Sequence, residues 1–336
     1  MTDPRLAQED VPPNEAFHTQ RLTDRLQAKI ERDNAGGPMR RDAHAKMHGL
    51  VRAEFSVEPG LPEALRVGLF SQVRSYPAWV RFSNQSGSLA PDIQGDIRGM
   101  AIKLMGVDGD ILQTASPADR TADFILISTP VFVTRDVAEF DGLLGALTGS
   151  LWAKAVFFLS HWRVLFNVLG SLKKFANPLQ VRYFSATPYR LGAQAVKYSA
   201  RPVGTVADAL PVHPEPDFLR LAMQRQLAAG DAVFDFSVQL QTDAQAQPIE
   251  DPGRLWPESV SAFQKVASLR IPSQAFESPA QRALGENLSF NPWRTLAEHR
   301  PVGGINRARR SVYEAISRFR HDKNGAEQAE PAGWDL

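Results

Sequence analysis

One tyrosine and two arginines share a face of a predicted helix near the end of the chain. The segment 305–321 has amphipathic spacing, and Arg309, Tyr313 and Arg320 follow one another at intervals of four and seven residues. A phenol with a pKa of ~10 is only about 0.1% ionised at neutral pH, so forming a phenolate costs about 4 kcal/mol. A ferric ion on the oxygen and a guanidinium one turn away both favour the charged form. The pattern is compatible with a phenolate metal ligand, but by itself a tyrosine flanked by arginines on a basic helix is more often a surface residue with cation–π neighbours.

Two histidines and a lysine alternate at the start of the first predicted strand. On a strand, His44, Lys46 and His48 would share one face. Such a pair could bind a metal, or one of the two could act as an acid–base group near neutral pH. Lys46 argues against a metal, because an ammonium repels a cation. A polar strand face exposed to solvent is the interpretation without function, and for His48 we favour a structural role.

Five short segments, in order, carry a resemblance that none of them carries alone. They are RxxHAK from Arg41, VRFSN from Val80, RGxAIK from Arg98, STPVFVTRD from Ser128 and RxxxYxxxxRxR from Arg309. This series resembles the diagnostic segments of haem catalases, and it runs discontinuously from residue 41 to residue 320. The chain is most similar to the small catalase-related proteins, because it lacks room for the long wrapping and C-terminal parts of full catalases.

The resemblance implies a haem b site and a role for each matching residue. Tyr313 would be the proximal iron ligand with Arg309 as its charge partner, and His44 the distal acid–base residue. Ser83 would hydrogen-bond the distal histidine and fix its tautomer. Two kinds of position contact the haem itself: the propionate partners Arg41, Arg81 and Arg320, and the aromatic residues Phe132 and Phe140 over and beside the ring.

Two departures from the catalase pattern lie near the predicted distal side. Ile127 stands where catalases place an asparagine that orients a second peroxide, and Val133 replaces a phenylalanine. Loss of one pre-organised polar group typically costs about a hundredfold or more in rate. We therefore expect a peroxidase that uses a small organic electron donor to reduce organic, including lipid, hydroperoxides, with weak or no catalase activity.

Four other functions stay open at this point. One is a true catalase that dismutates hydrogen peroxide, and another is a fatty-acid hydroperoxide isomerase or lyase. The third is a haem carrier without enzymatic activity. The last is a barrel that binds an apolar ligand without haem.

The elements that must position these residues are short strands followed by helices. A helix is predicted over Glu15–Asn34, and a short one over Asp217–Ala229. The predicted strands are Lys46–Val57, Ala78–Ser83, Gly99–Met105, Phe124–Thr129, Ala193–Pro202, Val233–Gln241 and Gln264–Ile271. No helix connects the first four, which favours an α+β protein with an antiparallel barrel of about eight strands, wrapped by helices. The final helix would carry the haem-ligand tyrosine.

We divide the chain into three regions. Residues 1–40 form an N-terminal helical arm, and residues 41–321 the haem-binding barrel domain with an apolar helical insertion at 143–175. Residues 322–336 are expected to be a solvated polar tail. Within the insertion, Lys154, His161 and Arg163 interrupt the apolar run at 143–172, so it is too short to span a bilayer. It would cover the core, roof an apolar channel, or make a peripheral membrane contact.

The composition excludes several classes of protein. A formal charge of +1 argues against binding to nucleic acid. The absence of cysteine excludes disulfides, cysteine-based zinc sites, iron–sulfur clusters and thiolate-ligated haem. The polar, acidic start does not resemble a signal peptide, so we expect a cytoplasmic protein. We also expect a homo-oligomer, with a dimer as the simplest form.

Overall fold

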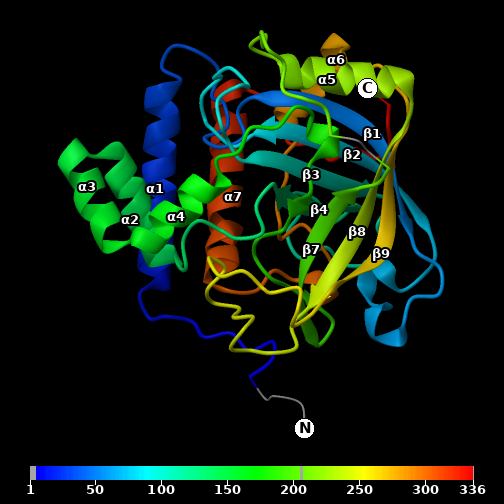
Figure 1. Ribbon diagram of the computed structural model, residues 1–336, viewed down its shortest axis with the longest axis horizontal. Helices are drawn as coiled ribbons and strands as arrows, with labels where there is room; N and C mark the ends of the chain where they lie inside the picture. The colour runs from blue at the N-terminus through cyan, green and yellow to red at the C-terminus, as the bar shows by residue number, and fades with distance from the viewer. Residues whose placement is uncertain (1–4, 205–206, 336) are drawn as a thin grey trace.

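Eight antiparallel strands close into a barrel (Figure 1). The computed structural model describes residues 5–204 and 207–335. The strands pair in the order β5-β4-β3-β2-β1-β9-β8-β7, and β7 returns to β5, which closes the barrel; β6 pairs with β7 only. The strands are β1 Met47–Val57, β2 Ser75–Asn84, β3 Arg98–Met105, β4 Thr121–Ile127, β5 Tyr183–Phe184, β6 Tyr189–Leu191, β7 Gln194–Pro202, β8 Ala232–Leu240 and β9 Phe263–Ile271.

Side chains fill the interior of the barrel. Alternate residues of the strands point inward and form the largest apolar cluster. Four aromatic rings lie at its centre, with centroid separations of 5.1 Å between Phe55 and Phe236, 4.7 Å between Phe124 and Phe236, and 5.1 Å between Phe124 and Tyr198. The space for a large ligand must therefore lie outside the barrel, between its wall and the helices.

The helices wrap the barrel from several sides (Figure 1). The α-helices of the described residues are α1 Glu15–Asp33, α2 Val137–Thr148, α3 Leu151–Ser160, α4 Trp162–Ser171, α5 Phe218–Ala229, α6 Pro279–Asn287 and α7 Gly304–Asn324. Single turns of 3₁₀-helix are η1 Glu63–Leu65, η2 Gly68–Phe70, η3 Pro178–Gln180 and η4 Ala297–His299. The first and last helices, α1 and α7, pack against each other, and α2 to α4 project beside them.

The predicted architecture is confirmed: the protein is α+β, with an antiparallel barrel of eight strands wrapped by helices. All seven predicted strands occur, each within a few residues of its expected ends, and the predicted insertion appears as α2, α3 and α4. The sequence did not predict α6, β5 or β6. No helix among residues 5–204 and 207–335 is long and apolar enough to cross a membrane.

The C-terminal tail differs from the solvated segment that we expected. Glu330 is 3.0 Å from Arg294 and also pairs with Lys103 at 2.6 Å, and its side chain is only 5% exposed. Further along, the indole of Trp334 donates a hydrogen bond to the carbonyl of Ala78 at 3.0 Å. The prediction of a solvated tail is therefore wrong for this part, because a buried pair of cations on the barrel binds the tail carboxylate.

Candidate active site

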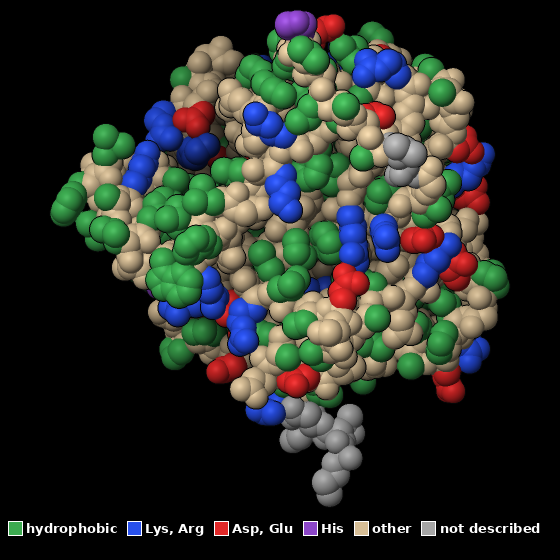
Figure 2. Space-filling model, viewed as in Figure 1, with side chains coloured by type: hydrophobic (Ala, Val, Ile, Leu, Met, Phe, Trp, Pro, Cys, Tyr) green, Lys and Arg blue, Asp and Glu red, His purple; other side chains and the backbone are tan. Residues whose placement is uncertain are grey.

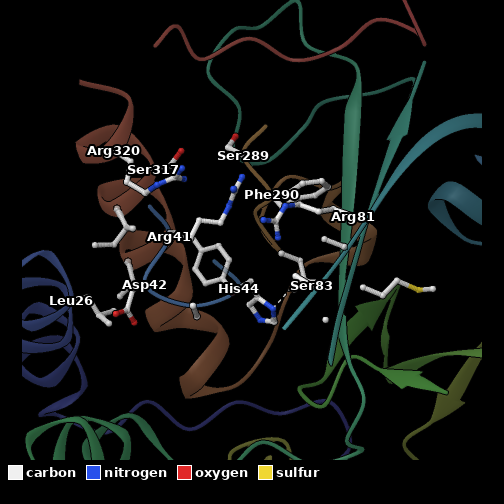
Figure 3. A pocket seen from close by; sticks show the side chains of 18 of the residues that line it. Leu26, Arg41, Asp42, His44, Arg81, Ser83, Ser289, Phe290, Ser317 and Arg320 are labelled. Carbon is white, nitrogen blue, oxygen red and sulfur yellow. Dashed lines mark hydrogen bonds between the residues drawn. The ribbon is translucent and has the colours of Figure 1, made fainter. Parts of the chain in front are cut away.

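A mostly apolar cavity lies between the outer wall of the barrel and helices α1 and α7 (Figure 3). It contains about 900 Å³ of space free of protein atoms, part of which opens to solvent. It is lined by residues of four of the five sequence segments, all but the one from Ser128, and by other residues, namely Leu26, Arg41, Asp42, Ala43, His44, Arg81, Ser83, Gly99, Met100, Ala101, Ile125, Leu126, Ser289, Phe290, Val312, Tyr313, Ile316, Ser317 and Arg320. Residues 26 and 320, nearly 300 positions apart in sequence, thus border one site.

The alternation of β2 explains why polar residues line this cavity. Val80 and Phe82 point inward and belong to the barrel core. Arg81 and Ser83 therefore point outward, into the space under α7. The next strand, β3, contributes Gly99 opposite Ser83 in the antiparallel register.

His44 lies just before β1 and not on it. Its φ of 63° is in the left-handed region, and its backbone N–H donates to the carbonyl of Gln85 at 2.9 Å. This turn corrects the prediction that His44, Lys46 and His48 share one strand face. The ring is held by Ser83, whose Oγ is 3.0 Å from Nδ1 (Figure 3). Burial, followed by the positive charges of Arg81, Arg309 and Arg41, lowers the pKa of His44 to about 3, so the imidazole is neutral.

The absence of a side chain at Gly99 makes room for the imidazole. A Cβ built on Gly99 would lie 2.5 Å from both Cε1 and Nδ1 of His44 and 3.0 Å from Oγ of Ser83. Real Cβ atoms do not approach other atoms that closely, so any other residue would displace the histidine. Sequence reasoning did not assign Gly99 to the site, although its place in the RGxAIK segment was visible.

Tyr313 and Arg309 lie on one face of α7, as the spacing predicted. Nη2 of Arg309 donates to the Tyr313 hydroxyl at 2.9 Å, and its guanidinium carbon lies 5.0 Å from the ring centroid. Burial alone would lower the pKa of Arg309, but the adjacent Tyr313 and Tyr189 raise it. Arg309 itself does not line the cavity, so it contacts Tyr313 from outside the cavity.

Three buried arginines meet at the cavity with few anions to balance them. The guanidinium groups of Arg41 and Arg81 are neighbours in Figure 3, and Arg320 reaches the same region from α7. Burial, with the charge of Arg41 as the next cause, lowers the pKa of Arg81 and also that of Arg320, the latter to about 10. Glu286 is the carboxylate beside them, and its side chain is 45% exposed.

The contacts of these arginines are mostly with backbone carbonyls. Arg41 donates to Leu288, while Nε of Arg81 donates to Gly285 at 3.1 Å. The buried Nη2 of Arg81 makes no hydrogen bond, and the nearest carboxylate oxygen, on Glu286, is 3.7 Å away. Buried cations with an unsatisfied donor favour the binding of anionic groups at this end of the cavity.

Two predicted aromatic residues lie beside the cavity but do not line it. Phe132 and Phe140 contact each other edge to face, with centroids 5.3 Å apart, and pack on a small apolar cluster that includes Val312. Val312 lines the cavity. Their proposed contact with haem therefore stays a prediction.

Ile127 lies close to the predicted distal histidine. In the β3–β4 register it is paired with Gly99, the residue against which His44 packs. Directly paired residues point to the same face of a sheet, so the apolar side chain lies on the His44 side. It occupies the position at which the sequence departs from the catalase pattern.

Lys46 and His48 belong to a buried polar network outside the cavity. Nζ of Lys46 is 2.7 Å from Asp92, and Nε2 of His48 is 2.7 Å from Oδ1 of Asn84, which also accepts from Arg98. Lys46 is 6% and His48 1% exposed. The alternative of a solvent-exposed strand face is therefore wrong, because β2 and the loop carrying Asp92 cover these residues.

The start of α7 is fixed by an ion-pair cluster on the side away from the arginines. Arg307 pairs with Glu9 at 2.8 Å, Glu15 at 2.7 Å and Glu250 at 2.9 Å. Burial alone would lower its pKa, but the hydrogen bonds that Arg307 donates to Glu15 and Glu250 raise it. The N-terminal arm is therefore part of what holds Tyr313 in place.

Solved structures of catalases resemble the chain. A fungal catalase matches with a TM-score of 0.67 and 18% identity, over 87% of this chain and 61% of the catalase. Catalase A from Saccharomyces cerevisiae matches with a TM-score of 0.67 and 17% identity, over 88% of this chain and 65% of the catalase. A bacterial catalase matches with a TM-score of 0.66 and 16% identity, over 98% of this chain and 66% of the catalase. The chain thus spans somewhat less than two thirds of each. No protein-family model and no curated protein matches the sequence. The chain therefore has a catalase-like fold, as the five sequence segments predicted.

Proposed function

We propose that the chain is a haem peroxidase that reduces organic hydroperoxides to alcohol and water with two electrons and two protons from an organic donor. The observation that carries this is the meeting of Tyr313, His44 and three arginines at one cavity. The residues come from segments that are far apart in the chain, and an unrelated fold would have no reason to bring them together.

The side chains at this cavity fit haem b. The Tyr313 hydroxyl would supply an oxygen ligand for ferric iron, and Arg309 donates a hydrogen bond to this oxygen. The orphaned Nη2 of Arg81 and its neighbours Arg41 and Arg320 provide partners for two propionates. The remaining lining is largely apolar, as a porphyrin face requires. When bound, haem iron would supply the electrons and the coordination site for O–O cleavage.

The residues of the chain supply the proton transfer. His44 is neutral at neutral pH because its pKa is about 3, so it can accept a proton from a hydroperoxide. Since Oγ of Ser83 occupies Nδ1, the proton is taken up at Nε2 and returned from there to the leaving oxygen. Because Ile127 is apolar, the His44 side of the site has no polar side chain at this position. This side is therefore more suitable for the organic group of a hydroperoxide than for a second molecule of hydrogen peroxide.

The first test is haem binding by the purified protein. We expect hemin to bind in a 1:1 ratio and to give the absorption and electron paramagnetic resonance spectra of a ferric phenolate. Tyr313→Phe should lose these spectra. Tyr76→Phe is the matched control, because Tyr76 does not line the cavity and its hydroxyl donates to the carbonyl of Leu69 at 3.3 Å. Identical spectra for the wild type and Tyr313→Phe would exclude the proposed ligand.

The second test compares two reactions of the haem-loaded protein. Oxidation of an organic donor by cumene hydroperoxide should be strong, and oxygen release from hydrogen peroxide should be weak. Vigorous oxygen release would instead identify a true catalase. Conversion of a polyunsaturated fatty-acid hydroperoxide without consumption of a donor would identify an isomerase or lyase.

A further inference from the structure

The molecule has one concentrated apolar surface, on the helices that follow β4. Nineteen large hydrophobic residues are exposed in the described chain, and nine of them lie between residues 147 and 172. We call these nine the hairpin surface: Leu147, Leu151, Trp152, Val156, Leu159, Trp162, Phe166, Leu169 and Leu172. Hydrophobic side chains gather over this projecting part of the molecule in Figure 2. Soluble monomers rarely expose a contiguous patch of this kind without a partner.

The exposed residues follow the helical repeat. In α3, Trp152, Val156 and Leu159 occupy positions i, i+4 and i+7, and in α4 the same spacing is shown by Trp162, Phe166 and Leu169. Each triad therefore forms one stripe along its helix. Leu159 is 82% exposed, and α3 has no buried residue at all. An apolar helix of this kind is unfavourable in water unless something covers it.

The opposite face of α4 is bound firmly to the protein. Arg163 makes a bidentate ion pair with Asp251 at 2.7 and 2.8 Å. Oγ of Ser171 is 3.3 Å from Oγ1 of Thr129, in the segment after Ile127. The inward face of α4 thus combines these polar contacts with the buried Val164, whereas Trp162, Phe166 and Leu169 point outward.

The charged residues of the segment that carries the hairpin surface are all basic. No aspartate or glutamate occurs between residues 142 and 207, although the whole chain has nearly equal numbers of acidic and basic residues. Lys154, Lys173 and Lys174 lie in or just after the two helices, and none of them makes an ion pair with a described residue. An apolar face accompanied by unpaired cations is complementary to an anionic lipid surface.

A second copy of the chain fits this surface less well. The commonest dimer symmetry pairs a patch with itself. Lysines without neighbouring carboxylates would then face lysines, and like charges across an interface are unfavourable.

We propose that the hairpin surface docks on a bilayer that contains anionic lipids, with α3 and α4 lying in the interface. The two helices are ten residues each, about half the length needed to span the hydrocarbon core, so they would insert their apolar stripes only. Two tryptophans, Trp152 and Trp162, are among the residues on these stripes, and indole rings favour the headgroup region. This proposal goes beyond the peroxidase activity and does not depend on it.

Vesicle flotation with the full chain, without added hemin, tests the proposal. We expect binding to vesicles of phosphatidylglycerol and phosphatidylcholine at low ionic strength, and little binding to phosphatidylcholine alone. The triple variant Trp162→Ser/Phe166→Ser/Leu169→Ser should weaken binding by about a hundredfold. The control Val73→Ser/Val212→Ser changes exposed apolar residues elsewhere and should leave binding unchanged. Binding that is equal on both vesicles, or equal in the triple variant, would overturn the proposal.

The contribution of charge is tested separately. Lys173→Glu/Lys174→Glu should weaken binding by at least about fivefold for each position, since each basic residue near an anionic surface contributes about that factor. Arg225→Glu, at an exposed site on α5, is the control.

A spectroscopic measurement covers the case in which the triple variant fails to fold. Tryptophan fluorescence of the wild type should be quenched by brominated lipids, and Trp152→Phe/Trp162→Phe should lose this quenching. If no quenching occurs, or if the wild type is a dimer that the triple variant converts to a monomer without any vesicle binding, the hairpin surface is not a membrane site.

Discussion

At the scale of single residues, Gly99 sets the space available to the predicted catalytic histidine. Gly99→Ala would place a Cβ within 2.5 Å of the His44 ring, so the imidazole must move away from Ser83. We expect donor oxidation by cumene hydroperoxide to fall by about a hundredfold, because a displacement of about 1 Å has effects of this size. The measurement is kcat/KM of the haem-loaded variant.

Gly230→Ala provides the control for this substitution. Nothing lies within 4 Å of a Cβ built on Gly230, and its φ of 169° is extended backbone that alanine also adopts. The control should keep full activity. Full activity in Gly99→Ala as well would mean that His44 does not act from the position that the structure gives it.

Ile127 offers a test of what distinguishes this site from that of a catalase. Its side chain lies on the His44 side of the sheet, opposite Gly99. Ile127→Asn should raise oxygen release from hydrogen peroxide by about tenfold or more, because a pre-organised amide can orient the second peroxide. Ile127→Leu, which keeps an apolar side chain at the same position, is the matched control. Equal oxygen release by the two variants would show that the asparagine position is not what limits dismutation.

The sequence predicted most of the site but not its local geometry. The cavity is bordered by five motif residues, namely Arg41, His44, Arg81, Tyr313 and Arg320. They could be predicted because the sequence motifs consist of the residue types that the chemistry requires. The positive φ of His44 could not be predicted, since strand ends are uncertain by a few residues and histidine rarely adopts this conformation. The buried network of Lys46 and His48 was also unpredictable, because burial of a polar residue depends on partners far away in sequence.

At the scale of elements, the C-terminal tail is bound to the outside of the barrel through the buried ion pairs of Glu330. Glu330, Asp123, Lys103 and Arg294 form a buried group of two anions and two cations. Glu330→Gln leaves Lys103 and Arg294 to share the single carboxylate of Asp123, and removing one member of a buried ion-pair group costs about 3 kcal/mol or more. We expect the free energy of unfolding in urea to fall by about that amount.

Glu327→Gln is the control for the tail, since this residue is exposed and only three positions away. Its free energy of unfolding should stay within about 0.5 kcal/mol of the wild type. Equal stability of both variants would show that the tail is not bound to the barrel in solution.

Elements with strong periodicity were predictable, and elements defined by tertiary contacts were not. The seven longer strands alternate clearly, whereas β5 has two residues and β6 three, too few for a pattern. The helix α6 did carry a local signal, because Ser278 caps it through the N–H of Gln281 and Pro279 occupies its first turn. The tail looked solvated because its composition is polar, and only the barrel residues show where Glu330 binds.

At the scale of the whole molecule, the fold keeps several histidines neutral. Burial is the main cause that lowers the pKa of His48 to about 4 and that of His299 to about 3. In the unfolded chain the pKa of a histidine is about 6.5. Below that pH the unfolded state binds protons that the native state does not, so acidification favours unfolding. The stabilisation is present above about pH 6.5 and is lost progressively as the pH falls toward the native values.

We therefore expect the free energy of unfolding to decrease between pH 6.5 and 5, by up to about 1.4 kcal/mol per pH unit for each such histidine. His48→Gln should reduce this slope by up to about 1.4 kcal/mol per pH unit, the contribution of one proton. An amide can replace the imidazole beside Asn84 without titrating. The exposed His213→Gln is the control and should leave the slope unchanged. This pH range lies above that in which most carboxylates titrate, so the slope reports on histidines. If stability is constant from pH 6.5 to 5, these rings are accessible to protons in the native state and the packing around β1 and η4 is looser than the structure shows.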